Sequence, residues 1–196
     1  MSKAKPNASR KNALSRSEKI AIPIIILIAA WVVYSLFQPA VPTPPTTSTQ
    51  TTGTLGAPDF TLPVVSSTGL TGQTVTLSSF RGKVVLLEFM EPWCPHCQDM
   101  APVLERLYAQ YGSNGVIILS ISGPWQGATA QDTAQFIKNY GSSWSYAYDS
   151  SGSVMSEYGV NSTPTFMIIG KDGSLVGRYD GEQSYETLAA GLSAAS

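Results

Sequence analysis

Hydrophobic and polar positions divide the chain into four segments. Residues 1–19 are polar, residues 20–38 are apolar and uncharged, and residues 39–54 contain four prolines and seven threonines. From residue 55 to residue 196, short apolar runs alternate with polar stretches that contain glycine. An uncharged apolar run of about 18 residues or more can cross a membrane as a helix, whereas a Pro/Thr-rich stretch cannot build a core. The pattern predicts a transmembrane anchor helix at 20–38, a linker at 39–54 and one folded domain at 55–196.

The alternation within residues 55–196 predicts strands and helices in turn. Strand patterns at 60–65 and 74–77 flank Gly69 and Gly72 and predict an N-terminal β-hairpin. Further strands are expected at 83–90, 116–122, 145–148, 165–169 and 174–179, and helices at 95–111, 129–140, 152–158 and 184–194. This order predicts an α/β domain with a central mixed sheet.

Charge distinguishes the segments further. The net charge of −1 arises from 12 Lys and Arg and 13 Asp and Glu. Residues 1–19 carry six cations and one anion, +5, whereas residues 55–196 carry six cations and twelve anions, −6. Because positively charged flanks stay inside, we expect a basic cytoplasmic tail at 1–19, a single-pass signal anchor in the cytoplasmic membrane and an extracytoplasmic domain. A charged fraction of 13% excludes a large basic surface for nucleic acid.

A buried core helix and a cleavable signal peptide are the alternatives for residues 20–38. The apolar region of a signal peptide usually has about 7 to 15 residues, and its cleavage site needs small residues. The uncharged run is longer than that, and Gln38 stands two positions before Ala40, where a small residue is required. The uncleaved anchor is therefore favoured.

The chemistry of the chain concentrates at Trp93-Cys94-Pro95-His96-Cys97, directly after the apolar strand at 83–90. Cys94 at a helix N-terminus faces unpaired backbone N–H groups, which favour its thiolate and make it the attacking sulfur. Pro95 suits the first helical position, and His96 adds a donor or partial cation close to the sulfur. Cys97 lies within one helical turn and can close a disulfide with Cys94. The spacing predicts a redox-active disulfide.

Other uses of these residues are a zinc site, a static disulfide or a metal-delivery module. Zinc needs about four ligands, but the chain has two cysteines and one histidine in a single cluster. A peroxiredoxin is the rival enzyme, although its threonine three positions before the cysteine is replaced by Glu91. The redox reaction needs no metal or organic cofactor.

Several separated positions resemble the thioredoxin superfamily across nearly all of residues 55–196. They are Glu88 six before Cys94, Ala101-Pro102, Tyr158-Gly159-Val160, Thr163-Pro164-Thr165-Phe166 and Lys171-Asp172-Gly173. The resemblance implies a thioredoxin-like fold. The hairpin, an extra helix and strand, and the anchor resemble the TlpA/ResA branch, whereas Pro95-His96 resembles the active site of DsbA-type oxidases. The first likeness implies reduction of specific partners such as apocytochromes, and the second implies oxidation.

Roles for the supporting residues follow from the motif and the resemblance. Glu88 lies in an apolar strand, where burial favours the neutral carboxyl, and it is expected to relay a proton to or from Cys97. Trp93 is expected to shield the sulfur and contact substrate, with core packing as the alternative. A cis bond before Pro164 would bring the Thr163 backbone beside Cys94. Glu91 is expected at the surface. Protein thiols and disulfides are the expected substrates, with a membrane redox partner.

Overall fold

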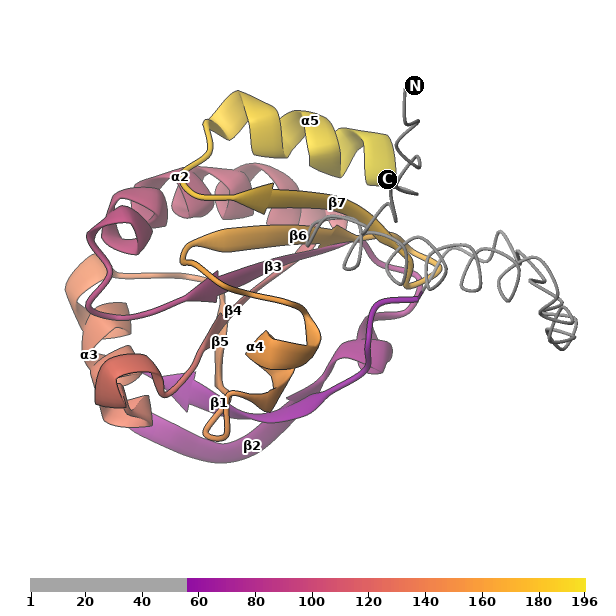
Figure 1. Ribbon diagram of the computed structural model, residues 1–196. Helices are drawn as coiled ribbons and strands as arrows, with labels where there is room; N and C mark the ends of the chain where they lie inside the picture. The colour runs from indigo at the N-terminus through magenta and orange to yellow at the C-terminus, as the bar shows by residue number, and fades with distance from the viewer. Residues whose placement is uncertain (1–55) are drawn as a thin grey trace, which may run out of the picture. The chain divides into compact units, whose positions relative to one another are not determined.

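The structure, a computed structural model, describes residues 56–196, which form a seven-stranded mixed β-sheet covered by helices on both faces (Figure 1). The strand order is β2-β1-β5-β4-β3-β6-β7. This arrangement confirms the α/β class and the thioredoxin-like fold. The tail, anchor helix and linker predicted at 1–54 lie outside the described residues. No helix within residues 56–196 is both long enough and apolar enough to span a bilayer.

The three central strands are parallel and the outer ones are antiparallel. β3 pairs in parallel with β4, and β4 with β5, whereas β1 and β2 on one side and β6 and β7 on the other run antiparallel to their neighbours. The strands are β1 Thr61–Ser66, β2 Gly69–Thr76, β3 Val85–Met90, β4 Ile117–Ser122, β5 Ser145–Tyr148, β6 Thr165–Ile169 and β7 Leu175–Asp180.

The helices begin and end at residues that favour helix termini. The described α-helices are α2 Pro95–Tyr111, α3 Ala130–Tyr140, α4 Ser153–Glu157 and α5 Tyr185–Ala195, with 3-10 turns η1 Leu77–Phe80, η2 Gly112–Asn114 and η3 Trp125–Gly127. Thr129 and Asp132 form a capping box at the start of α3, and Gly141 ends that helix in the left-handed conformation. The expected helices agree with these bounds to within one residue at each end.

The β1–β2 hairpin differs from its prediction in where the chain reverses. Ser66 pairs directly with Gly69, so the turn consists of Ser67 and Thr68 rather than the stretch from Gly69 to Gly72. Gly72 instead lies where the register between the strands shifts, with a φ of 77° that a side chain would disfavour. β2 is therefore longer than the pattern at 74–77 indicated.

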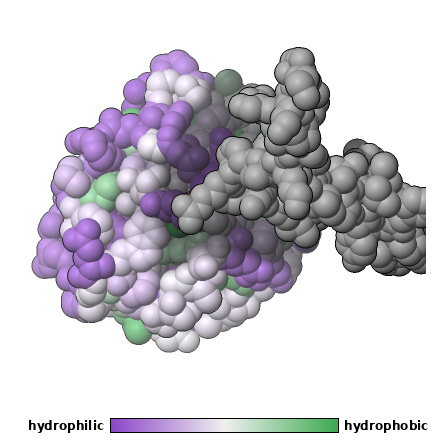
Figure 2. Space-filling view, in the orientation of Figure 1, coloured by the Kyte–Doolittle hydropathy of each residue, from purple (hydrophilic) through white to green (hydrophobic). Residues whose placement is uncertain are grey.

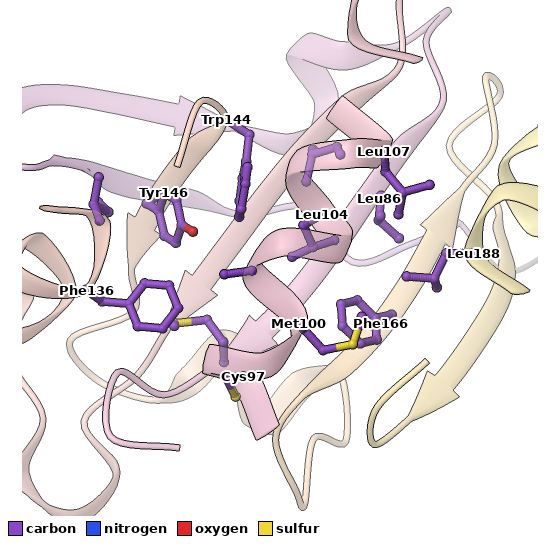
Figure 3. Close-up of a cluster of buried hydrophobic side chains, with 14 of the residues drawn as sticks. Leu86, Cys97, Met100, Leu104, Leu107, Phe136, Trp144, Tyr146, Phe166 and Leu188 are labelled. Atoms are coloured by element: carbon purple, nitrogen blue, oxygen red, sulfur yellow. The ribbon is translucent and has the colours of Figure 1, made fainter. Parts of the chain in front are cut away.

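Each face of the sheet has its own hydrophobic core. Helices α2, α3 and α5 cover one face, where Leu104 and Leu107 of α2 lie between Trp144 and Tyr146 on one side and Leu188 on the other (Figure 3). Helix α4 and the chain around Phe60 cover the opposite face. Because side chains alternate along β3, Glu88 shares the α2 face with its neighbours at positions 86 and 90.

The chain enters the domain beside the turn between β6 and β7. Gly56 forms a β-bridge with Ser174, and the N–H of Ala57 donates to the carbonyl of Gly173 at 2.8 Å. This turn follows Ile169, which pairs with Val85 at the start of β3. The entry point is therefore at the end of β3 opposite the one that leads to Cys94.

Candidate active site

The two cysteines occupy the first turn of α2, directly beyond the carboxyl end of β3. Cys94 is the N-cap of the helix, and Pro95 is its first residue, as expected. The N–H of Cys94 donates to the carbonyl of Glu91 at 3.0 Å, which closes the turn between strand and helix. At this end of α2, Pro95 has no N–H, and the N–H groups of Cys97 and Gln98 both donate to the Cys94 carbonyl at 3.1 Å.

The Cys94 sulfur is held between two backbone groups. The N–H of Cys97 donates to Cys94 Sγ at 3.4 Å, and Sγ lies 3.4 Å from the carbonyl oxygen of Thr163, to which its S–H donates. Both cysteines are free and buried, with 4% of Cys94 and 1% of Cys97 exposed. Cys94 is thus the more exposed of the two residues, which suits it to meet an incoming disulfide first.

The loop that carries Thr163 is fixed from strand β7. The Thr163–Pro164 peptide bond is cis, as expected, and places the Thr163 carbonyl against Cys94 Sγ. Arg178 donates to the carbonyls of Tyr158 and Gly159 at 2.9 and 3.1 Å and forms an ion pair with Asp180. Sequence reasoning missed Arg178, because nothing along the chain links it to a loop 20 residues earlier.

Glu88 is buried beneath α2 in a short polar network. It is 1% exposed and is flanked across the sheet by Ser120 of β4 and Phe166 of β6. The Ser120 hydroxyl donates to Glu88 Oε2 and accepts a hydrogen bond from Trp144 Nε1 at 2.7 Å. Glu88 Oε1 is buried with no hydrogen-bond partner. The carboxyl therefore keeps one oxygen free for a proton.

Burial and charge couple Glu88 to Cys97. Burial raises the pKa of Glu88 to about 7, although the hydrogen bond from Ser120 lowers it. Burial also raises the pKa of the Cys97 thiol, and the negative charge of Glu88 raises it further. Since each negative charge disfavours the other, a proton lost by Cys97 is best accommodated on Glu88.

Trp93 lies at the surface beside the cysteines. Its side chain is 42% exposed, and its Nε1 donates to the carbonyl of Trp125 at 3.3 Å. This exposure excludes the core-packing alternative for Trp93. Trp125 belongs to the 3-10 turn between β4 and α3, so the hydrogen bond links that segment to the active-site turn.

His96 points toward a different partner from the one expected. Its Nδ1 pairs with Glu182 Oε1, both side chains are largely exposed, and the structure records no hydrogen bond from His96 to either sulfur. His96, Asp99 and Glu182 bring potential ligand atoms within 4.8 Å of one another. These groups could hold a divalent cation at the surface, but they do not include the thiols.

The burial of Glu91 differs from what was expected. The sequence placed it at the surface, yet it is 0% exposed. Its Oε1 accepts from the N–H of Gly123 at 3.2 Å, whereas Oε2 is buried without a partner. Burial raises the pKa of Glu91 to about 8, although hydrogen bonds from Gly123 and Trp125 lower it. The available signal was the alternation along β3, since Glu91 follows Phe89 on the buried face that α4 covers.

The site combines a dithiol at the start of a helix, a cis-proline loop against the Cys94 sulfur and a buried carboxyl that is coupled to Cys97. Together these features define a class of protein. The class is the thioredoxin-like thiol:disulfide oxidoreductases. Comparisons with known sequences and structures identify the family within this class. The AhpC/TSA family matches residues 55–178, and the chain belongs to that family as a ResA-like member of the thioredoxin superfamily.

Individual relatives agree with this placement. The thiol-disulfide oxidoreductase ResA of Bacillus thuringiensis subsp. konkukian is 34% identical over 134 residues, which cover 67% of this chain and 72% of that protein. A Chlorobium tepidum structure assigned as thiol:disulfide interchange protein DsbE is 28% identical, with a TM-score of 0.64 over 71% of this chain and 94% of that one. The exposed lipoprotein thioredoxin Etrx1 of Streptococcus pneumoniae is 27% identical, with a TM-score of 0.60 over 70% and 99%.

Proposed function

We propose that this protein is a membrane-anchored, extracytoplasmic thiol:disulfide oxidoreductase that exchanges disulfides with protein substrates through Cys94 and Cys97. The observation that carries the proposal is the position of Cys94 Sγ, between the Cys97 N–H and the Thr163 carbonyl at the N-terminus of α2. The backbone beside this sulfur can pair with an extended substrate segment, and the Cys97 N–H already donates to the sulfur.

In the first step, the Cys94 thiolate attacks one sulfur of a substrate disulfide. A bond forms between Cys94 and that sulfur, the substrate S–S bond breaks, and the other substrate sulfur leaves as a thiolate. In the opposite direction, a substrate thiolate attacks the Cys94–Cys97 disulfide and gives the same mixed disulfide with Cys97 reduced. Both directions use the same contacts.

The second step resolves the mixed disulfide. Cys97 loses its proton and attacks Cys94 Sγ, which forms the Cys94–Cys97 disulfide and releases the reduced substrate, so that two electrons pass to the substrate. Glu88 is the proton acceptor for Cys97, because its Oε1 is unpartnered and its pKa of about 7 lets it exchange protons near neutral pH. In the oxidising direction Glu88 returns this proton.

The membrane location rests on residues 1–54. The +5 tail, the uncharged run and the Pro/Thr-rich linker support a single-pass anchor with its N-terminus in the cytoplasm. Because the sequence contains no other cysteines, Cys94 and Cys97 form its redox centre. A membrane redox partner would return this pair to its starting oxidation state after each exchange. Fusion of alkaline phosphatase after residue 54 tests the orientation, since phosphatase activity requires export and an inactive fusion contradicts it.

The alternative function is a ResA-type reductase of specific partners, of the kind used in cytochrome c maturation. The identity to ResA favours it, whereas Pro95-His96 favours an oxidising dithiol. The reduction potential of the Cys94–Cys97 pair separates the two. On the scale of known proteins, a value of about −120 mV indicates an oxidant and one of about −270 mV a reductant.

Cysteine variants test the core of the proposal. Cys94→Ser is expected to abolish both insulin reduction and thiol oxidation, because no other sulfur can attack. Cys97→Ser is expected to keep the first step and to accumulate mixed disulfides that appear on non-reducing gels and disappear with dithiothreitol. Wild-type protein with both thiols alkylated is the control. Activity in Cys94→Ser, or no mixed disulfide in Cys97→Ser, contradicts the mechanism.

A further inference from the structure

A groove of about 390 Å³ opens beside the active-site turn, on the side that faces α3. Trp93 and Gln98 flank the cysteines on one wall, and Gln126, Gln135, Asn139 and Tyr140 contribute to the others. We call it the Trp93 groove. Its volume is near the lower end of the range of about 300–1,000 Å³ typical of ligand sites, which suits a few side chains of a peptide.

The aromatic side chains of the Trp93 groove are its first distinguishing feature. Trp93 is 42% exposed and Tyr140 41%, and they are two of the five large apolar side chains exposed among residues 56–196. The ring of Tyr140 packs on Phe136 with 4.6 Å between centroids, which holds it at the groove wall. The face drawn in Figure 2 is mostly polar, with scattered apolar residues. Two exposed rings in one groove offer contact to an apolar side chain.

The polar lining is uncharged apart from one residue. Side-chain amides line the groove at Gln98, Gln126, Gln135 and Asn139. Gln98 Nε2 donates to the Pro92 carbonyl and Gln135 Nε2 donates to Asn139 Oδ1, and the remaining amide groups can donate to or accept from a peptide backbone. The single charged residue, Asp132, already accepts from the backbone N–H and the hydroxyl of Thr129 in the α3 capping box. No Lys or Arg lines the groove. This lining favours an uncharged segment over an acidic one.

The backbone of the groove wall supports a binding role. Gln126 has a φ of 52°, and it is the one non-glycine residue with positive φ among residues 56–196. Such a conformation is costly and is retained mainly at functional sites. The hydrogen bond from Trp93 to the carbonyl of Trp125 ties this strained turn to the residue before Cys94. The groove is thus lined by the residue that directly precedes Cys94 in the chain, although neither cysteine lines it.

We propose that the Trp93 groove binds an extended, uncharged segment of the substrate protein that carries an aromatic or aliphatic side chain close to its reacting cysteine. This inference rests on the proposed function and adds the substrate class to it. The groove depends on α3 and the turn before it, which belong to the extra helix and strand between β4 and α4. This extra segment therefore selects substrates, while the dithiol performs the exchange.

The test uses short peptides whose single cysteine is a mixed disulfide with thionitrobenzoate. Attack of Cys94 on the peptide sulfur releases thionitrobenzoate, which is followed by absorbance, and Cys97 then releases the peptide. Peptides with Phe, Ser, Lys or Glu at each position around the cysteine are compared with the small disulfide DTNB. The wild-type protein is expected to prefer the best Phe peptide over its Ser counterpart by about tenfold.

Two matched variants on α3 test whether the preference for Phe over Ser peptides arises in the Trp93 groove. Gln135→Lys places a cation in the groove and is expected to reduce the Phe-over-Ser ratio to near one. Gln131→Lys makes the same change one turn earlier, at an exposed position that does not line the groove, and is expected to preserve the ratio. Circular dichroism of both variants verifies their folding.

The outcomes separate failure of the inference from failure of the proposed function. Equal rates for Phe and Ser peptides in the wild type, or an unchanged ratio in Gln135→Lys, overturn the groove assignment while the exchange chemistry stands. A preference for Lys or Glu peptides overturns the uncharged occupant. If the reduced protein releases thionitrobenzoate from neither the peptides nor DTNB, the proposed function itself fails.

Discussion

Ser120 donates a hydrogen bond to one carboxylate oxygen of Glu88, while the other oxygen is equally buried and has no partner. The two residues lie side by side on β4 and β3, and Trp144 completes the contact by donating to the Ser120 hydroxyl. A buried carboxyl with a single fixed partner can change protonation without reorganising its surroundings. This arrangement distinguishes a proton acceptor from a carboxylate held in an ion pair, and it leads to the first two predictions.

Ser120→Ala is expected to shift the pH dependence of mixed-disulfide resolution toward higher pH. The hydrogen bond from Ser120 lowers the pKa of Glu88, so its loss raises that pKa above about 7 and leaves less of the basic form at neutral pH. The rate at which product thiol leaves the Cys94 mixed disulfide, measured from pH 5 to 9, tests this. Ser122→Ala on the same strand contacts Thr133 instead and serves as the control. An identical profile in Ser120→Ala would contradict the relay.

Glu88→Gln is expected to slow resolution by about 100-fold while leaving the first attack by Cys94 little changed. An amide of the same shape cannot accept the proton of Cys97, and general base catalysis typically contributes about 100-fold or more. Stopped-flow measurement of both steps with a thionitrobenzoate disulfide separates them. A purely structural role for Glu88 would slow both steps equally or neither.

Glu91 gives a prediction on stability. Its pKa of about 8 in the folded protein exceeds the ordinary glutamate pKa of 4.5, so folding favours the protonated form. The contribution of protonated Glu91 to the free energy of unfolding is fully present below about pH 4.5 and is lost as the pH rises through about 8. Glu91→Gln remains neutral at both pH values. The difference in the free energy of unfolding between this variant and wild type is therefore expected to favour the variant by roughly 1 to 3 kcal/mol more at pH 9 than at pH 5.

Urea unfolding at the two pH values measures this difference. Glu157→Gln removes an exposed carboxyl on α4 and is expected to show no comparable pH-dependent gain. An equal difference between Glu91→Gln and wild type at pH 5 and pH 9 would show that burial of Glu91 does not favour its proton.

Arg178→Ala is expected to impair exchange with protein disulfides without touching the cysteines. The side chain holds the carbonyls of Tyr158 and Gly159, which begin the loop that ends at Thr163 beside Cys94. Loss of these bonds is expected to lower the free energy of unfolding by about 1 to 3 kcal/mol and kcat/KM for insulin severalfold. Arg106→Ala, which removes a cation that stacks on Tyr185, is the control for a surface arginine.

Local signals were enough to predict most of the fold. Pro95 and Gly112 bracket α2, and Thr129 and Gly141 bracket α3, so caps and breakers located the helices. The hairpin was less accurate because glycines with positive φ serve both turns and bulges. Only pairing across the strands reveals that Gly72 lies at the register shift.

For the active site, too, some features could be predicted from the sequence and others could not. The five-residue motif and the cis peptide bond before Pro164 could be expected from the sequence and the family resemblance. Burial of Glu91 depends on the N–H of Gly123, 32 residues away, and the partner of His96 is Glu182, 86 residues away. The Trp93 groove likewise requires α3 to pack beside the active-site turn. Such relationships arise from tertiary packing, which composition and spacing do not specify.

The chain enters the domain beside the β6–β7 turn, where Gly56 pairs with Ser174. The dithiol follows the other end of β3, so the point of attachment and the reactive sulfur lie at opposite poles of the sheet. A protein substrate that docks at Cys94 therefore approaches the domain from the end of β3 that lies away from Gly56 and Ser174.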